Sequence, residues 1–270
     1  MRRKLIIGLC ILVVLLAGIG IYLRNGFYGN CVLERRSLYV RSGSEYRTLE
    51  DSLDAAIAHT AFFRFYARHI ELDRSFKPGH YVLEPGMNVV QVARMLKLGL
   101  QTPVRVTINN VRTPAQLAGK LARQIEADSA TIVGALTDPA TARKAGLDSV
   151  TLFSMFIPDT YEFYWTVSPA QFIERMRREY DRFWTPQRDA KRQRSGLSRL
   201  EVMTLASIVY EETRQSDEMP RIAGVYINRL RKGWPLQADP TVKYALQEFG
   251  LRRILHRHLK YPSPYNTYIN

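Results

Sequence analysis

The chain has 270 residues, which is enough for one large domain or two ordinary ones. Hydrophobic residues make up 46% and charged residues 24%, fractions typical of a globular protein, so wholesale disorder is excluded. The two cysteines exclude a fold built on disulfides. The 39 Lys and Arg residues outnumber 25 Asp and Glu residues and give a net charge of +14, which predicts a polyanionic neighbour without distinguishing nucleic acid, anionic lipid and acidic polymer.

An uncharged run of nineteen residues, 5–23, follows three consecutive basic residues at the N-terminus. As a helix it would be about 28 Å long, close to the roughly 30 Å hydrocarbon core of a bilayer. The alternative is a cleaved signal peptide, but its apolar region is usually about 7–15 residues long and ends in small residues, which 22–25 do not provide. We therefore predict a transmembrane anchor over residues 1–24 with a cytoplasmic tip.

Basic residues are concentrated before the apolar run, whereas only Arg24 lies within ten residues of its trailing end. The positive-inside tendency therefore favours a cytoplasmic N-terminus and an exported body. Residues 1–24 carry four basic and no acidic residues, so the body keeps a charge of +10. Most of the excess positive charge thus belongs to the part outside the membrane.

The body predicts an α+β fold rather than a repeated βαβ series. A spacer is expected at 25–36, followed by an N-terminal module at 37–104. Asn88 and Gln91 form a capping-box pattern that starts a helix ending near Gly99. The module's other expected elements are strands at 37–40, 80–84 and 104–108 and one or two helices within 49–69.

The second part, 105–270, is expected to be helix-rich. Pro114 and Pro169 each stand at a first helical position. The stretch 186–195 is basic and hydrophilic, with Arg188, Lys191, Arg192 and Arg194. We interpret it as a solvated linker, and contact with a polyanion is the alternative.

The segment around Glu212 offers a candidate catalytic acid. Ser198 and Glu201 predict the start of a helix. On this helix Glu212 lies one and two turns after the apolar residues Leu205, Ile208 and Val209. A carboxyl held against apolar groups has a raised pKa and suits a general acid. Glu211 falls on a polar stripe and is predicted to be solvated. The alternative is that Glu212 simply turns into water at a frayed helix end.

Three further polar residues are candidates for ligand contact. Gln237 lies just outside a helix start, where its amide can donate hydrogen bonds to a ligand. Asp239 precedes Pro240, a pattern that favours helix capping over catalysis. Asn266 belongs to a closing run of aromatic and amide residues that suits an amide-bearing sugar or a packed turn. Histidine and cysteine spacing predicts no metal site, and no nucleotide-binding motif is present, so no cofactor is expected.

Several segments together resemble one family. They are Ile157-Pro158-Asp159-Thr160-Tyr161, Leu205-Ala206-Ser207-Ile208-Val209-Tyr210-Glu211-Glu212-Thr213, Val225-Tyr226-Ile227-Asn228-Arg229-Leu230, Leu236-Gln237-Ala238-Asp239-Pro240-Thr241-Val242 and Tyr265-Asn266-Thr267-Tyr268. In this order and spacing the chain closely resembles the MltG (YceG-like) family of endolytic murein transglycosylases. Residues at about 76–101 resemble that family's small LysM-like subdomain, and 105–270 its catalytic domain.

The resemblance implies roles for individual residues. Glu212 would be the catalytic residue, and Gln237, Asp239 and Asn266 would lie near the sugar. Tyr210 departs from the acidic or polar residue usual at its position. Family members also continue beyond the Asn-Thr-Tyr segment, so the chain is expected to be C-terminally truncated.

The implied reaction is non-hydrolytic cleavage of MurNAc–GlcNAc bonds in nascent peptidoglycan strands, which leaves 1,6-anhydroMurNAc ends and limits strand length. The implied location is the inner membrane, in a single pass, with a periplasmic body. Expected partners are glycan strands, inner-membrane lipid and peptidoglycan synthases, and no nucleic acid. The alternatives are a non-catalytic peptidoglycan-binding membrane anchor, a membrane-tethered nucleic-acid binder using 188–194, and a lysozyme-like hydrolase.

Overall fold

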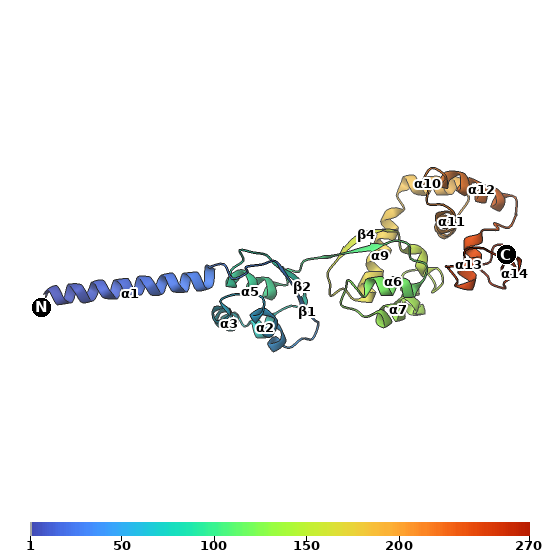
Figure 1. Ribbon diagram of the computed structural model, residues 1–270. Coiled ribbons are helices and arrows are strands. Elements are labelled where there is room, and N and C mark those ends of the chain that lie inside the picture. The colour runs from blue at the N-terminus through green and yellow to red at the C-terminus, as the bar shows by residue number, and fades with distance from the viewer. Residues whose placement is uncertain (1) are drawn as a thin grey trace. The chain divides into compact units, whose positions relative to one another are not determined.

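The computed structural model describes residues 2–270, apart from the side chains of residues 2, 4 and 5. It confirms a mixed, helix-rich α+β protein with an apolar N-terminal helix and small two-stranded sheets (Figure 1). The chain separates into two compact units. The first comprises residues 1–107, 120–129 and 160–168, and the second comprises 108–119, 130–159 and 169–270. The predicted division at 104/105 lies close to 107/108, where the chain first passes from the first unit to the second. The later segments 120–129 and 160–168 belong to the first unit again.

The first unit begins with the long helix α1 (Arg2–Tyr28). Its stretch Ile6–Tyr28 has a mean hydropathy of 2.9 and is long and apolar enough to cross a membrane. The sequence predicts a spacer at 25–36, but this segment is part of the fold, because α1 continues to Tyr28 and both Cys31 and Val32 are fully buried. The physical reason is that the segment's apolar side chains pack into the core of the first unit.

A small antiparallel sheet and four helices complete most of the first unit. Strand β1 (Arg36–Val40) pairs with β2 (Gly79–Leu83), with Arg36 opposite Leu83 and Val40 opposite Gly79. The helices are α2 (Tyr46–Asp54), α3 (Thr60–His69), α4 (Leu72–Ser75) and α5 (Val89–Leu98). Their apolar faces enclose one core, to which α3 contributes Phe63, only 1% exposed.

The helix α5 begins and ends as the sequence predicts. The Asn88 side chain accepts a hydrogen bond from the backbone of Gln91, and the Gln91 side chain accepts one from the backbone of Asn88, both at 2.9 Å. Gly99 ends the helix at φ 70°, a left-handed conformation that costs glycine little. The predicted capping box is therefore confirmed.

A second two-stranded sheet pairs β3 (Val104–Ile108) with β4 (Asp159–Phe163). Its strands are joined by a 2.8 Å hydrogen bond between the hydroxyls of Thr107 and Thr160. The segment 120–129 contacts the beginning of the first unit through Glu126. Its carboxylate accepts two hydrogen bonds from Ser42, one from the backbone N–H and one from the hydroxyl, each at 2.6 Å. These contacts explain why later segments return to the first unit.

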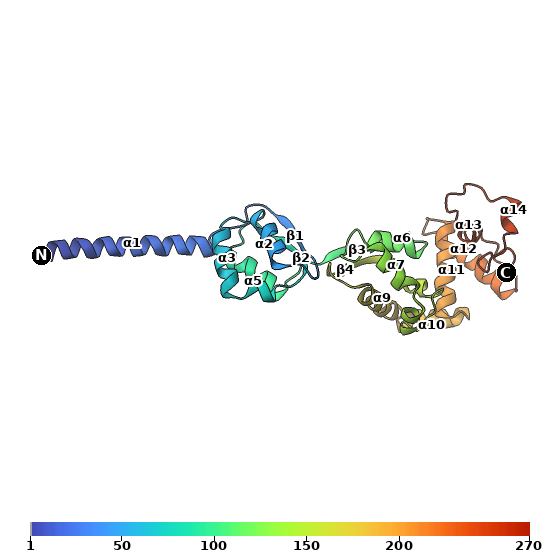
Figure 2. The same cartoon turned by 90° about the horizontal axis from the view of Figure 1, so that it is seen from below.

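The second unit is almost entirely helical (Figure 2). Its elements are α6 (Pro114–Leu121), which ends in the first unit, α7 (Ser129–Thr137), α8 (Pro139–Lys144), the short 3-10 helix η1 (Leu152–Met155), α9 (Pro169–Phe183), α10 (Pro186–Ser195), α11 (Arg199–Glu212), α12 (Met219–Arg231), α13 (Asp239–Leu246) and α14 (His256–Leu259). One of its apolar clusters joins α11 to α12 and consists of the buried residues Leu205, Ile208, Val209, Tyr226 and Ala238.

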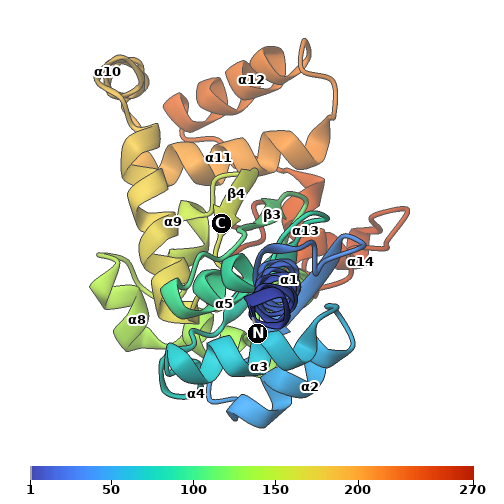
Figure 3. The same cartoon turned by 90° about the vertical axis from the view of Figure 1, so that its left-hand side faces the viewer.

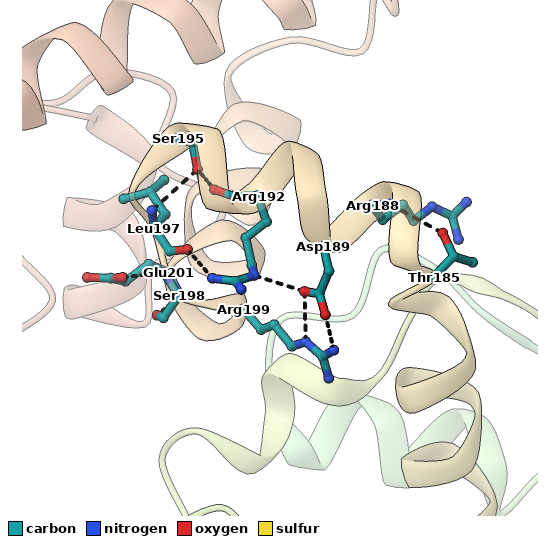
Figure 4. Close-up of polar contacts among 9 residues, drawn as sticks. All are labelled: Thr185, Arg188, Asp189, Arg192, Ser195, Leu197, Ser198, Arg199 and Glu201. Atoms are coloured by element: carbon teal, nitrogen blue, oxygen red, sulfur yellow. Dashed lines mark hydrogen bonds and ion pairs between the residues drawn. The ribbon is translucent and has the colours of Figure 1, made fainter.

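The predicted linker at 186–195 is instead the helix α10 (Figure 4). Thr185 caps its start by accepting a hydrogen bond from the backbone of Arg188, and Gly196 ends it at φ 78°. Asp189 accepts from Arg192 at 2.9 Å and also from Arg199 at the start of α11. These arginine hydrogen bonds lower the pKa of Asp189 to about 2. Part of the basic charge is thus used to connect α10 with α11.

Candidate active site

The helix α11 positions the candidate acid at its last residue. Its start is the predicted capping box: the Ser198 hydroxyl accepts from the backbone of Glu201 at 3.2 Å, and the Glu201 carboxylate accepts from the backbone of Ser198 at 2.7 Å. The helix ends at Glu212, after which Thr213 is extended. Since the apolar face of α11 packs against α12, the position of Glu212 depends on the contact between these two helices.

Glu212 accepts a hydrogen bond at its Oε1 atom from the hydroxyl of Tyr226 on α12, over 2.8 Å. Tyr226 is buried, with 7% exposure, whereas Glu212 is exposed. One oxygen of Glu212 is therefore held by a buried group. The sequence predicts a carboxyl enclosed by apolar residues, and this prediction is wrong, because the side chain is exposed. Its other oxygen, Oε2, makes no hydrogen bond to any described residue.

The environment of Tyr226 keeps its hydroxyl protonated. Burial raises the pKa of Tyr226, and the hydrogen bond to Glu212 and the negative charge of that carboxylate raise it further, while the positive charge of Arg229 lowers it. At neutral pH the phenol is therefore a hydrogen-bond donor. The Glu212 carboxyl group is consequently anchored at Oε1 and accessible at Oε2, an arrangement suited to proton exchange with a ligand.

The prediction that Glu211 is a solvated neighbour is wrong. Arg112 donates to both of its carboxylate oxygens, at 3.2 and 2.8 Å, and Arg214 forms an ion pair with it at 3.6 Å. The Arg112 guanidinium also lies over the ring of Phe249, 5.3 Å from the ring centroid. Consecutive positions on a helix point about 100° apart, so Glu211 faces these arginines while Glu212 faces Tyr226.

Tyr210, the departure from the family pattern, has a structural contact of its own. Its hydroxyl donates to the side-chain oxygen of Asn110 at 2.9 Å. Arg214 donates to the same oxygen at 3.1 Å and lies over the Tyr210 ring, 4.1 Å from its centroid. These contacts bind the end of α11 to the segment 108–119.

The predicted capping role of Asp239 is wrong, because Ala238 occupies the N-cap of α13 and Asp239 is its first helical residue. The Asp239 carboxylate instead accepts a hydrogen bond from the hydroxyl of Tyr268 at 2.7 Å. Burial raises the pKa of Tyr268 to about 12, and the hydrogen bond to Asp239 and the charges of Asp239 and Glu212 contribute to that shift. Asp239 and Glu212 therefore lie close enough to Tyr268 for both of their charges to raise its pKa.

Gln237 has a left-handed backbone, with φ 52°, directly before α13. Its backbone N–H donates to the carbonyl of Thr267 at 2.9 Å, which joins it to the C-terminal segment. Its side chain is exposed and makes no hydrogen bond to the described residues. The side-chain amide of Gln237 is thus available to a ligand, since no local contact uses it.

Asn266 is fully buried and has a structural environment. Its side-chain nitrogen donates to the carbonyls of Leu259 and Tyr261, at 3.0 and 2.8 Å, and its side-chain oxygen accepts from the backbone of Tyr268 at 3.1 Å. In this conformation its amide is occupied by backbone. Asn266 therefore fixes the segment that carries Thr267 and Tyr268, rather than offering free hydrogen-bonding groups to a sugar.

The structure thus brings Glu212 and Asp239 into one neighbourhood with two tyrosines and Arg229, and Gln237 directly precedes that region. The sequence alone predicts no site role for Tyr226, Tyr268 or Arg229. The available signal was their position in two of the segments that carry the family resemblance, 225–230 and 265–268. Among the described residues, no group of three or more His, Cys, Asp and Glu side chains is arranged to hold a metal ion.

Comparison with known proteins identifies the family of the chain. The model of the YceG-like family matches residues 38–270, so the chain belongs to that family. It is 26% identical over 223 residues to the endolytic murein transglycosylase of Bacillus subtilis strain 168, and 23% identical over 265 residues to that of Streptococcus pneumoniae serotype 2 strain D39. These matches cover 77% and 86% of this chain, but only 61% and 47% of the relatives.

A crystal structure of a yceG-like protein from Listeria monocytogenes has a similar fold. It superposes with a TM-score of 0.57 at 26% identity and covers 88% of this chain and 83% of that chain. The fold similarity thus extends over both units of the chain, whereas the matches span about half of the length of the curated relatives.

Proposed function

We propose that the protein is a membrane-anchored endolytic lytic transglycosylase that cleaves MurNAc–GlcNAc bonds in peptidoglycan strands. The observation that carries the proposal is the Glu212 carboxylate, held at Oε1 by the buried Tyr226 hydroxyl and unbonded at Oε2. Membership of the YceG-like family and relatives named endolytic murein transglycosylases support the same reaction class.

In the proposed reaction Glu212 acts first as an acid and then as a base. Its carboxyl proton moves to the glycosidic oxygen, the bond from that oxygen to C1 of MurNAc breaks, and an oxocarbenium-like centre develops at C1. The resulting carboxylate takes the proton of the MurNAc 6-hydroxyl, whose oxygen then bonds to C1. The products are a 1,6-anhydroMurNAc end and a GlcNAc 4-hydroxyl, and Glu212 is again protonated. No second carboxylate is needed, because the nucleophile belongs to the substrate, unlike in the two-carboxylate glycosidases.

The neighbouring residues have complementary roles in this proposal. Tyr226 holds Oε1, so the exchangeable proton resides on Oε2, the oxygen that is open to the substrate. The free amide of Gln237 and the carboxylate of Asp239 bind sugar hydroxyl or acetamido groups. Asn266 is assigned a positioning role, since its contacts fix the backbone that carries Tyr268, the hydrogen-bond partner of Asp239.

The remainder of the chain brings this site to its substrate. The helix α1 would anchor the protein in the inner membrane, with the N-terminus in the cytoplasm and the remainder of the chain in the periplasm. Residues at about 76–101 would act as a LysM-like glycan-binding element. Cleavage of nascent strands near the membrane would limit strand length. At that location the protein would lie beside peptidoglycan synthases.

Mass analysis of digested glycan strands tests the reaction directly. The intact chain is expected to generate 1,6-anhydro ends, and the Glu212→Gln variant is expected to generate few. Glu211→Gln is the matched control: it neutralises the adjacent carboxylate, which is paired with Arg112 and Arg214, and should retain activity.

Two other outcomes identify the alternatives. Reducing ends in place of anhydro ends would indicate a lysozyme-like hydrolase. Equal, background amounts of both ends from the intact chain and from Glu212→Gln would refute the enzymatic proposal, and binding to glycan strands in that case would indicate a non-catalytic peptidoglycan-binding anchor.

A further inference from the structure

The apolar helix α1 is packed against the remainder of the first unit instead of being joined to it by a free tether. The ring of Tyr22, within the apolar run, lies 5.3 Å from the ring of Phe62 on α3. Five residues later, the ring of Phe27 lies 5.0 Å from that of Phe62 and 5.9 Å from that of Phe65. Gly26 allows this close packing, because a Cβ atom at that position would overlap the Phe62 ring.

This packing places α3 at the edge of any bilayer that α1 spans. The uncharged run ends at Leu23, and the charge of Arg24 puts the hydrocarbon boundary near that residue, although the apolar stretch Ile6–Tyr28 continues slightly beyond it. Phe27 lies three residues further along the helix, or about 4.5 Å at about 1.5 Å per residue. Each headgroup layer is about 5 to 8 Å thick. Phe27 and the α3 residues that contact it therefore lie at the depth of the headgroups.

The outer face of α3 has the chemistry of a membrane interface. Ala61, Phe65 and Arg68 are spaced at i, i+4 and i+7, which places them on one side of the helix, and all three are exposed. Phe65 is 65% exposed despite its size. Arg68 forms no ion pair within the described residues, whereas Arg64 on the inner side pairs with Glu50 at 3.1 Å.

The figures agree with this placement within the first unit. Figures 1 and 2 show α3 at the end of the unit from which α1 leaves, with β1 and β2 at the opposite end. Figure 3, viewed along α1, shows α3 beside it.

We propose that the first unit rests on the membrane surface through α3, with Phe65 inserted among the headgroups and Arg68 and Arg24 bound to the phosphates of anionic phospholipid. This inference depends on the proposed membrane anchor. At headgroup depth an aromatic ring contacts the apolar edge of the bilayer, and a nearby unpaired arginine is attracted to anionic lipid. The first unit would thereby be held at a defined distance from the bilayer.

The test measures the depth of Phe65 in the full chain, reconstituted in vesicles of phosphatidylethanolamine and phosphatidylglycerol. A Phe65→Trp variant is compared with a Tyr39→Trp variant. Tyr39 is also exposed, at 53%, but lies on β1. The parent chain supplies the background of its three native tryptophans. Lipids brominated near the headgroup should quench the tryptophan of Phe65→Trp, with a blue shift of its emission, and should leave that of Tyr39→Trp unquenched.

Each result distinguishes docking from anchoring. If the chain floats with the vesicles but Phe65→Trp is quenched no more than Tyr39→Trp, docking is refuted and the anchor stands. If the chain does not float with them, the anchor itself is refuted. Quenching of Phe65→Trp should increase with phosphatidylglycerol, and Arg68→Gln in the same background should reduce that increase, while Arg24 retains part of it. An increase of undiminished size would refute the role of Arg68.

Discussion

Replacing Tyr226 with Phe removes the hydroxyl that holds Glu212 and leaves the rest of the site in place. The hydroxyl donates to Glu212 Oε1 at 2.8 Å, while the ring packs in the cluster that joins α11 and α12. Phe fills the same apolar space, so the fold should be retained. The substitution therefore isolates the contribution of one hydrogen bond to the orientation of the proposed acid.

The expected magnitude follows from the exposure of the two partners. A hydrogen bond to a charged group contributes about 1.5–3 kcal/mol, but Glu212 is exposed and water can replace the lost donor, which favours the lower end. About 1.4 kcal/mol corresponds to a tenfold change in rate, so kcat should fall by about tenfold. Loss of the acid itself in Glu212→Gln should lower kcat by a factor of about 10²–10⁴.

The assay is the initial rate of anhydro-end formation from purified glycan strands, measured for kcat and KM separately, together with the Tm of each variant. Tyr210→Phe is the matched control, because its hydroxyl makes a bond of similar length, 2.9 Å, to Asn110 and does not touch Glu212. The reasoning is refuted if Tyr226→Phe keeps the full kcat, or if Tyr210→Phe loses as much.

Three further outcomes are expected. The pKa of Asp189 is lowered from 3.8 to about 2, so its ionised form stabilises the fold above about pH 4, and this contribution is lost as the pH falls toward 2. The Tm of Asp189→Asn should therefore fall less over that range than the Tm of the parent chain. Identical Tm profiles would contradict a stabilising role for the contacts of Asp189 with Arg192 and Arg199. Burial raises the pKa of Cys31 to about 11, so maleimide at neutral pH should modify this thiol only after unfolding, and mass spectrometry that finds rapid labelling of the native chain would show the segment to be unpacked. Phe63→Ala should destabilise the first unit by about 3–5 kcal/mol in denaturant titration, because it empties a buried position, while a loss below about 1 kcal/mol would mean that the core is not closed there.

The sequence was sufficient for features that depend on neighbours along the chain. The apolar run of α1 and the capping boxes at Asn88 and Ser198 are correct because their determinants lie within a few residues of each other. The choice of Glu212 over Glu211 also came from local periodicity and motif, although its role remains a proposal. Such signals need no knowledge of the partner segment.

The tertiary structure alone determined which groups surround each carboxylate. Arg112 meets Glu211, Tyr226 meets Glu212 and Tyr268 meets Asp239, and these pairs are separated by 99, 14 and 29 positions in the chain. The capping role predicted for Asp239, the solvation predicted for Glu211 and the spacer predicted at 25–36 all failed for this reason. Helical periodicity shows which side of an element is apolar, but burial, hydrogen bonding and charge depend on the element packed against that side.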